Sequence, residues 1–294
     1  MAGAIVVEVR RGGVVESRHR VHYAAVRGGE LVAAAGDPAL VTFFRSAAKP
    51  IQALPLVRAR PDLDDRLVAI ACASHHANPD QVEAARDLLA AAPATEDDLE
   101  CGDQEGRPPG RIYHNCSGKH AGMLATCRAL GWPIEGYRLP DHPLQRALHE
   151  QVAAAAGLDT QDVPTAVDGC GVLTFALPLE RMACAFARLA ELDGGPRVLE
   201  AMRAWPELVG GEPSLDTRLM RALPGWAAKG GAEGLLCAVS PDGLGLAVKV
   251  EDGNQRAISP VLARLPVFPR ELREFARVPV LNSVGEDVGE VARA

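Results

Sequence analysis

The pattern of apolar and polar positions predicts strands at both ends of the chain and helices between them. Near the N-terminus, short runs rich in valine or aromatic residues are separated by the glycine pairs Gly12-Gly13 and Gly28-Gly29. Runs of this kind, broken by glycine, are typical of an antiparallel meander. We therefore predict strands at residues 4–9, 18–26 and 30–35.

The middle of the chain favours helices, because its apolar residues recur at helical spacing with glycine or proline near the ends. This pattern predicts helices at residues 79–91, 119–130, 143–156, 178–192 and 198–204. An earlier helix is expected at residues 46–58, where Pro50 is compatible only with a first turn. Ser46 should therefore lie at or near the entrance of that helix, a position in which serine is also a favourable N-cap.

Toward the C-terminus the pattern returns to that of strands. Residues 235–240 and 244–250 flank the turn Pro241-Asp242-Gly243 and predict a β-hairpin, followed by a helix at 257–265 and short β-like segments. This order predicts an α+β fold in which N- and C-terminal strands form one antiparallel sheet flanked by helices. We expect a single catalytic domain over residues 1–294, with a helical lobe at about 75–215 between the sheet-forming segments 1–60 and 225–294. A small-molecule site is expected in the cleft between the lobes.

Composition and charge argue against several classes of protein. The net charge of −7, without a basic stripe, argues against nucleic acid as a partner. No segment stays apolar long enough to cross a bilayer, and the N-terminus lacks the pattern of a secretory signal, so we expect a cytoplasmic protein. The seven cysteines are odd in number and irregularly spaced, which does not suit a disulfide framework.

Ser46 and Lys49 form the first motif with catalytic potential. If this segment opens a helix, the two side chains lie on one face, about 5–6 Å apart at their Cβ atoms. A lysine amine held partly neutral by burial or by nearby positive charge can then take the serine proton. Ser-x-x-Lys is the signature of penicillin-binding proteins and class A β-lactamases. The spacing alone is also compatible with a capping serine and a solvated lysine.

Two further segments bear on this serine. Ser74 follows an apolar run and should lie in a loop or at a helix edge. Lys229 precedes Gly230-Gly231 and the C-terminal hairpin, a position similar to that of the Lys-Thr-Gly strand of β-lactamases. Taken singly, a turn serine and a solvated lysine explain both residues equally well.

The segment around Cys116 collects a thiol, an ammonium group and imidazoles before a predicted helix. Here the helix dipole and Lys119 should both lower the pKa of the Cys116 thiol. Cys170 lies between glycines, so the two cysteines with a nearby His or Lys are candidate ligands for a soft divalent metal such as zinc. Two alternatives remain open: a cysteine-nucleophile amidase with Cys116 as nucleophile and His120 as base, or a non-enzymatic protein that senses thiol oxidation or metal.

Together these segments resemble the asparaginase II family, the zinc-containing Ser-Lys type of L-asparaginase. The resemblance runs over nearly the whole chain and is carried by five strings in order. They are Arg-Ser-Ala-Ala-Lys-Pro-Ile-Gln at 45–52, Ala-Ser-His at 73–75, Asn-Cys-Ser-Gly-Lys-His-Ala-Gly-Met at 115–123, Asp-Gly-Cys-Gly-Val at 168–172 and Ala-Lys-Gly-Gly-Ala-Glu-Gly at 228–234. After Ala-Ser-His the chain continues with His76-Ala77-Asn78-Pro79 where the family has Gly-Glu-Pro, which leaves the substrate contacts of that loop open.

The resemblance implies a fold like that of β-lactamases and penicillin-binding proteins, a homodimer, and hydrolysis of asparagine to aspartate and ammonia. It implies two Ser-Lys pairs, Ser46 with Lys49 and Ser74 with Lys229. It further implies a zinc ion held by Cys116, Lys119 and Cys170, with Arg45 and Asp168 lining the site and binding substrate. As a separate hypothesis, the zinc orients the substrate rather than activating water, and His75 is a further candidate for substrate binding.

Overall fold

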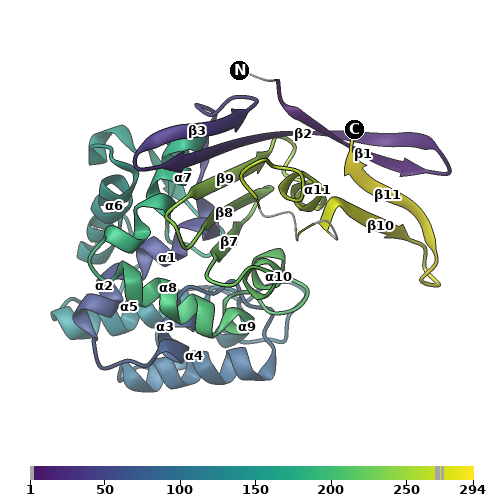
Figure 1. The fold of residues 1–294 in the computed structure, drawn as a ribbon. Helices are drawn as coiled ribbons and strands as arrows, with labels where there is room; N and C mark the ends of the chain where they lie inside the picture. Colours follow the sequence, from purple (N-terminus) through teal and green to yellow (C-terminus); the bar gives the residue numbers. More distant parts are fainter. Residues whose placement is uncertain (1–2, 269–271, 273–274) are drawn as a thin grey trace.

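A large antiparallel sheet forms one side of the molecule, and helices cover it (Figure 1). The computed structural model describes residues 3–268, 272 and 275–294. The strand order is β10-β11-β1-β2-β9-β8-β7, with β3 paired to β2. The strands are β1 Ile5–Arg11, β2 Val14–Arg27, β3 Glu30–Ala35, β7 Ala227–Gly231, β8 Leu235–Val239, β9 Gly245–Val250, β10 Arg277–Leu281 and β11 Asp287–Arg293. The expected α+β class, with N- and C-terminal strands in one sheet, is confirmed.

Helices fill most of the middle of the chain, as the spacing of apolar residues predicts. Residues 79–91 and 143–156 form helices with the expected bounds. The α-helices are α1 Lys49–Gln52, α2 Leu54–Ala59, α3 Asp65–Ala71, α4 Pro79–Ala91, α5 Ser117–Leu130, α6 Pro143–Ala156, α7 Leu179–Ala187, α8 Gly195–Ala204, α9 Pro206–Val209, α10 Leu215–Ala222 and α11 Ile258–Leu262. None of those in the described ranges is long and apolar enough to span a membrane.

The helix expected at residues 46–58 is divided into three pieces, which corrects that prediction. A 3-10 turn, η1 Arg45–Ala48, leads into α1 and then into α2. Pro50 and Pro55 each lie in the first turn of their helix. A proline lacks the N–H that an interior helix position needs, so two closely spaced prolines start two short helices.

The stretch 75–215 is not purely helical, because it also supplies strands and a helix to the sheet region. Strands β5 Thr165–Val167 and β6 Leu173–Pro178 join β4 Val41–Phe43 in a second, three-stranded sheet. Helix α7 packs against β2 and β9 of the large sheet. Gly245 permits this contact, because a Cβ atom there would lie 2.0 Å from the carbonyl oxygen of Ala183 in α7.

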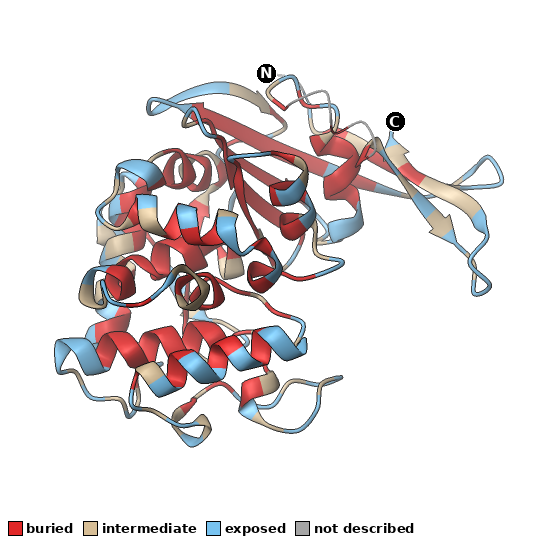
Figure 2. Ribbon diagram, turned by 60° about the horizontal axis from the view of Figure 1, so that its bottom comes forward, coloured by how far each residue is buried: buried red, intermediate tan, exposed pale blue. Residues whose placement is uncertain are grey.

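The core lies between the large sheet and the helices, where the central strands and the inner helix faces are buried (Figure 2). Strands β8 and β9 are buried along their whole length. This accounts for their continuous apolar runs, in contrast to the alternating pattern of β10, whose residues are alternately exposed and half-buried. The outer strands β10 and β11 pack on α11 and extend away from the other helices (Figure 1).

Candidate active site

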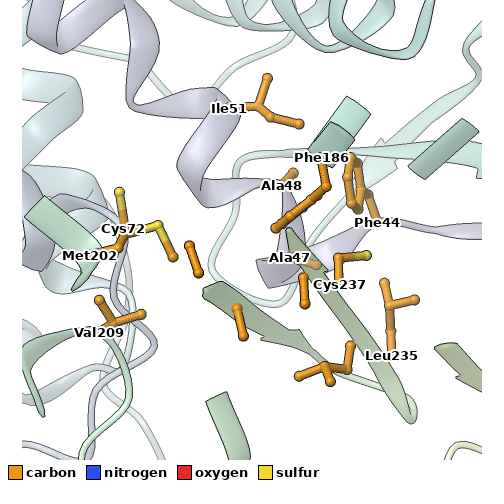
Figure 3. Packing of buried hydrophobic residues seen from close by; sticks show 14 of the residues in the cluster. Phe44, Ala47, Ala48, Ile51, Cys72, Phe186, Met202, Val209, Leu235 and Cys237 are labelled. Atoms are coloured by element: carbon orange, nitrogen blue, oxygen red, sulfur yellow. The ribbon is translucent and has the colours of Figure 1, made fainter. Parts of the chain in front are cut away.

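Ser46 is held at the entrance of α1 by apolar neighbours on either side of it. The backbone N–H of Phe44 donates to Phe175 O at 2.8 Å, which fixes η1 to β6. Phe44, Ala47 and Ala48 are buried and face the core, as Figure 3 shows. Ser46 itself is half-buried and lines a cavity. The apolar neighbours thus fix the backbone while the hydroxyl stays accessible.

The cavity has a volume of about 270 Å³ and brings together residues from distant parts of the sequence. The two candidate serines, Ser46 and Ser74, and the candidate lysine Lys229 all line it. Five further polar side chains, none of them predicted as a site residue, also line it: His76, Asn115, Ser214, Asp216 and Gln255. Three of the four predicted catalytic residues therefore share one accessible space.

Lys49 lies behind this cavity, with 1% of its surface exposed. Its Nζ is hydrogen-bonded to Ser74 Oγ at 2.9 Å and to the carbonyl oxygen of Ala73. Burial lowers the pKa of Lys49, and the positive charges of Lys229 and Lys119 act in the same direction, against the opposing effect of Cys116. Lys49 is therefore a buried amine in contact with a serine hydroxyl.

The expected pairing of serines with lysines differs from the observed hydrogen bonds. Lys49, expected to pair with Ser46, is bonded to Ser74. Lys229, expected to pair with Ser74, donates instead to Asp216 Oδ2 at 3.1 Å and to Gly230 O at 2.9 Å. The resemblance implies the pairs from the motifs alone, whereas the fold places the loop after α3 directly against the Lys49 amine.

Arg45 and Asp168 form an ion pair with each other. The guanidinium Nε and Nη2 both lie 2.9 Å from Asp168 Oδ1. Arg45 has a φ of 49°, an unusual value for a non-glycine residue, and its N–H donates to Thr174 Oγ1 at 3.1 Å. Within the described residues, neither Arg45 nor Asp168 lines the cavity, so the pair ties η1 to the loop that carries Cys170.

His75 has a position that does not support the expected substrate contact. It is fully buried, its Nδ1 accepts from the Ala77 N–H at 3.1 Å, and its Nε2 bonds to Ser117 Oγ at 2.8 Å. Burial lowers the pKa of His75 to about 3, so the ring is neutral. The next residue, His76, is exposed and lines the cavity, with its Nε2 bonded to Ser214 Oγ at 2.8 Å.

Cys116, Lys119 and Cys170 are brought into contact at the start of α5, immediately behind Lys49. Cys116 is the N-cap of α5, and Gly118 lets this helix approach α3, since a Cβ atom there would lie 2.2 Å from Ile70 O. The thiols of Cys116 and Cys170 are hydrogen-bonded, and Lys119 Nζ lies 2.9 Å from Cys170 Sγ. All three predicted metal ligands thus lie together.

The charges in this cluster favour an anionic sulfur. The hydrogen bond from Cys170 lowers the pKa of Cys116 well below its usual value, helped by Lys49 and Lys119 and opposed by burial. Burial alone would lower the pKa of Lys119, but Cys170 and Cys116 outweigh it and raise that pKa to about 12. Two thiols and an amine in contact are a chemically suitable donor set for zinc once the amine loses its proton.

Metal binding by the cluster of Cys116, Lys119 and Cys170 would require Lys119 as a ligand. Among residues 3–268, 272 and 275–294, no group of three or more His, Cys, Asp and Glu side chains has the geometry of a metal site. A third protein ligand beside the two thiols would therefore be Lys119. His120 is buried nearby, and its Nδ1 bonds to Tyr137 Oη at 2.6 Å.

The geometry gives little support to a nucleophilic Cys116. In the described part of the chain its thiol does not line the cavity and lies beside the free thiol of Cys170. Burial lowers the pKa of His120 to about 4, and the thiol beside this ring is that of Cys170. His120 is therefore not arranged as a base for Cys116.

Comparisons with known proteins are consistent with these motifs. The family model for L-asparaginase II matches residues 7–293, which is nearly the whole chain. No curated protein matches the sequence. Similar solved structures include a β-lactamase from Mycobacterium bovis, with 15% identity, coverage of 87% of this chain and 95% of the other, and a TM-score of 0.35. The unliganded simvastatin synthase of Aspergillus terreus has 13% identity, coverage of 94% and 92%, and a TM-score of 0.35.

At these TM-scores no activity follows from the two structures, whereas the family match covers every candidate site residue. The five strings that carry the site also fall within the matched range. The chain belongs to the L-asparaginase II family.

Proposed function

We propose that this protein hydrolyses the side-chain amide of L-asparagine, releasing aspartate and ammonia, with a serine as nucleophile. Membership of the L-asparaginase II family indicates an asparaginase-type amidohydrolase. The observation that carries the finer proposal is the shared cavity of Ser46 and Ser74, with the buried Lys49 amine bonded to one serine and one helical turn from the other. An unactivated serine is a poor nucleophile, and such an amine can activate it.

In the proposed reaction Ser46 Oγ attacks the amide carbon of asparagine, and its proton passes to neutral Lys49, directly or through Ser74. The tetrahedral intermediate collapses when Lys49 returns that proton to the amide nitrogen, which leaves as ammonia. Water then attacks the ester carbon and gives a proton to the Lys49 amine. Lys49 passes this proton to Ser46 Oγ as the ester bond breaks, which releases aspartate. Ser74, bonded to Lys49 at 2.9 Å, supports this relay.

We further propose that Cys116, Lys119 and Cys170 hold a zinc ion. Bound there, zinc would supply a positive charge that helps to orient a polar or anionic group of the substrate. The three residues contact the Lys49 side of the site through Cys116, so the ion would also influence the charge state of the base. The homodimer and the cytoplasmic location stay predictions.

Replacing Cys116 by serine is expected to remove most of the bound zinc. A hydroxyl is a much poorer ligand than a thiolate for this soft metal, so affinity should fall by about 10²-fold or more. Elemental analysis of dialysed protein measures the metal, and a thermal shift on zinc addition should disappear in parallel. Cys127→Ser, on the same helix and buried away from the cluster, is the matched control. Unchanged zinc content in Cys116→Ser would remove Cys116 from the ligand set.

An ammonia-release assay tests the proposed activity. The purified protein is incubated with L-asparagine, L-glutamine and a β-lactam, and ammonia, aspartate and ring opening are measured separately. Equal amounts of ammonia and aspartate from asparagine are expected. Selectivity over glutamine should be modest unless polar contacts discriminate, because one methylene changes binding by about 1–3 kcal/mol. Absence of turnover with all three compounds would contradict the proposal and favour a thiol- or metal-sensing role.

A further inference from the structure

Lysine is rare in this chain, and every lysine is buried. Only four of the 31 Lys and Arg residues are lysines, with exposures of 1% for Lys49, 5% for Lys119, 1% for Lys229 and 7% for Lys249. Three of the four belong to the candidate active site. The ion pairs recorded on the surface of the described residues use arginine instead. In this chain lysine is therefore confined to buried positions, and arginine supplies the positive charges of the surface ion pairs.

The two lysines proposed for catalysis have different partners. Lys49 is hydrogen-bonded to the hydroxyl of Ser74 and the carbonyl of Ala73, and the Cys116 thiol lies nearby. Lys229 lies against the carboxylate of Asp216, whose side chain is only 6% exposed. Among the residues that the structure describes, no other lysine forms an ion pair with a carboxylate. Burial lowers the pKa of Lys49, whereas Lys229 is held in an ion pair with a carboxylate.

Three hydrogen bonds hold the Asp216 carboxylate at the wall of the cavity. Its Oδ2 accepts from Lys229 Nζ and from the Gly230 N–H, both at 3.1 Å, and its Oδ1 accepts from the Thr217 N–H at 3.0 Å. Asp216 lies in the first turn of α10, which packs on β7 (Figure 1). Lys229 and its neighbouring N–H in β7 contribute to lowering the pKa of Asp216 against the effect of burial.

The hydrogen bonds of Lys229 leave one of its N–H donors for the cavity. An ammonium group has three N–H donors. Two of them are used by Asp216 Oδ2 and by Gly230 O at 2.9 Å. The third remains for the cavity, which Lys229 lines together with Ser46 and Ser74.

We propose that Asp216 is a positioning residue that keeps Lys229 as a fixed ammonium group aimed into the cavity. An ammonium has no lone pair and cannot act as a base, so Lys229 contributes charge and one hydrogen bond, and Lys49 carries the proton transfer. This division of roles rests on the proposed amidohydrolase function. It assigns to Lys229 the stabilisation of negative charge that develops on the substrate carbonyl oxygen.

Other titratable groups face Lys229 from each element packed against it. Lys49 approaches from α1, Cys72 and His76 from the segment at the end of α3, and Cys237 from the paired position on β8. Burial raises the pKa of Cys72 to about 12 and lowers that of His76, so these two groups are neutral near pH 7. Burial also raises the pKa of Cys237, so its thiol is neutral too. Asp216 is the group in this set that carries negative charge.

Replacing Asp216 by asparagine tests the proposal with little change of shape. Since the chain has four lysines, NMR of isotopically labelled lysine Cε and Nζ should give four resolved signals, each assigned by one Lys→Met substitution. In the wild type we expect Lys229 to stay an ammonium through the neutral pH range. In Asp216→Asn the Lys229 signal should change because its carboxylate partner is gone, and kcat/KM for asparagine should fall by about 10- to 100-fold.

Asp242→Asn is the matched control, because Asp242 is an exposed carboxylate that pairs with Arg27. It should leave the Lys229 signal and turnover unchanged. A wild-type Lys229 that is neutral near pH 7 would overturn the proposal without any variant, even if Asp216→Asn does not fold. An Asp216→Asn protein with an unchanged Lys229 signal and full turnover would overturn it as well. The NMR result is independent of turnover, so a protein inactive on asparagine would contradict the proposed function and still test Asp216.

Discussion

Ser46→Ala protein is expected to lose asparagine hydrolysis by about 10³-fold or more, while its fold is retained. The substitution removes one oxygen atom from a half-buried position that lines the cavity. The backbone around it is fixed by Phe44, Ala47 and Ala48 in the core and not by the hydroxyl. A loss of this size with unchanged circular dichroism and thermal unfolding would identify a chemical role. Ammonia release at saturating asparagine is the measurement.

Two comparisons make this result specific. Ser17→Ala changes a serine on β2 whose recorded side-chain bond is to Arg256 at 3.0 Å, and it should keep full activity. Ser74→Ala should slow turnover less than Ser46→Ala, by about 10²- to 10³-fold, because it removes the relay and not the nucleophile. Retained turnover in Ser46→Ala together with an inactive Ser74→Ala would reassign the nucleophile to Ser74, the serine in contact with Lys49.

Lys49→Met is expected to reduce kcat by about 10²- to 10⁴-fold, the range for loss of a general base. Methionine has nearly the length of lysine and suits a site with 1% exposure, so the core should tolerate it better than a truncation. Lys49→Arg restores the charge but cannot give up a proton, because guanidinium stays protonated at any working pH. We therefore expect Lys49→Arg to be as inactive as Lys49→Met. Steady-state kinetics of both variants measures this.

Lys249→Met provides the matched control for loss of a buried lysine. Lys249 is 7% exposed, and its Nζ bonds to the backbone carbonyls of Glu233 and Val250, outside the cavity. This variant should unfold at a lower temperature and yet keep its kcat. If Lys49→Arg instead keeps most of the activity, positive charge is what the site needs at this position, and the role of Lys49 as base is wrong.

The sequence predicts well those helices that have a recognisable start residue and a recognisable stop residue. The helix at 143–156 starts at Pro143 and is followed by Gly157, a C-cap in the left-handed conformation, and its bounds are as expected. Helix α3 was not predicted, although Asp64 caps it by accepting from the Leu67 N–H at 2.9 Å. At seven residues it is too short to show a helical period, so the cap was the available signal.

The serines, lysines and cysteines of the candidate site are predicted from the sequence, but their hydrogen-bond partners and the other polar residues that line the cavity are not. Short-range spacing indicates Ser46 with Lys49, and glycine-flanked cysteines indicate Cys116 and Cys170. The bonds that decide the chemistry are long-range: Lys49 and Ser74 are 25 residues apart, and Lys229 and Asp216 are 13 apart. Such contacts depend on how α3, α10 and β7 pack, which no local pattern contains. The same holds for His76, which meets Ser214 across 138 residues.

Trapping the covalent intermediate tests the central claim most directly. Wild-type protein is mixed with L-asparagine, quenched in acid during turnover, digested and analysed by peptide mass spectrometry. The account predicts a mass increase of one aspartyl group on the peptide that contains Ser46, absent from Ser46→Ala protein. An aspartyl group on Cys116 or Ser74, or undiminished ammonia release without any adduct on Ser46, would contradict it.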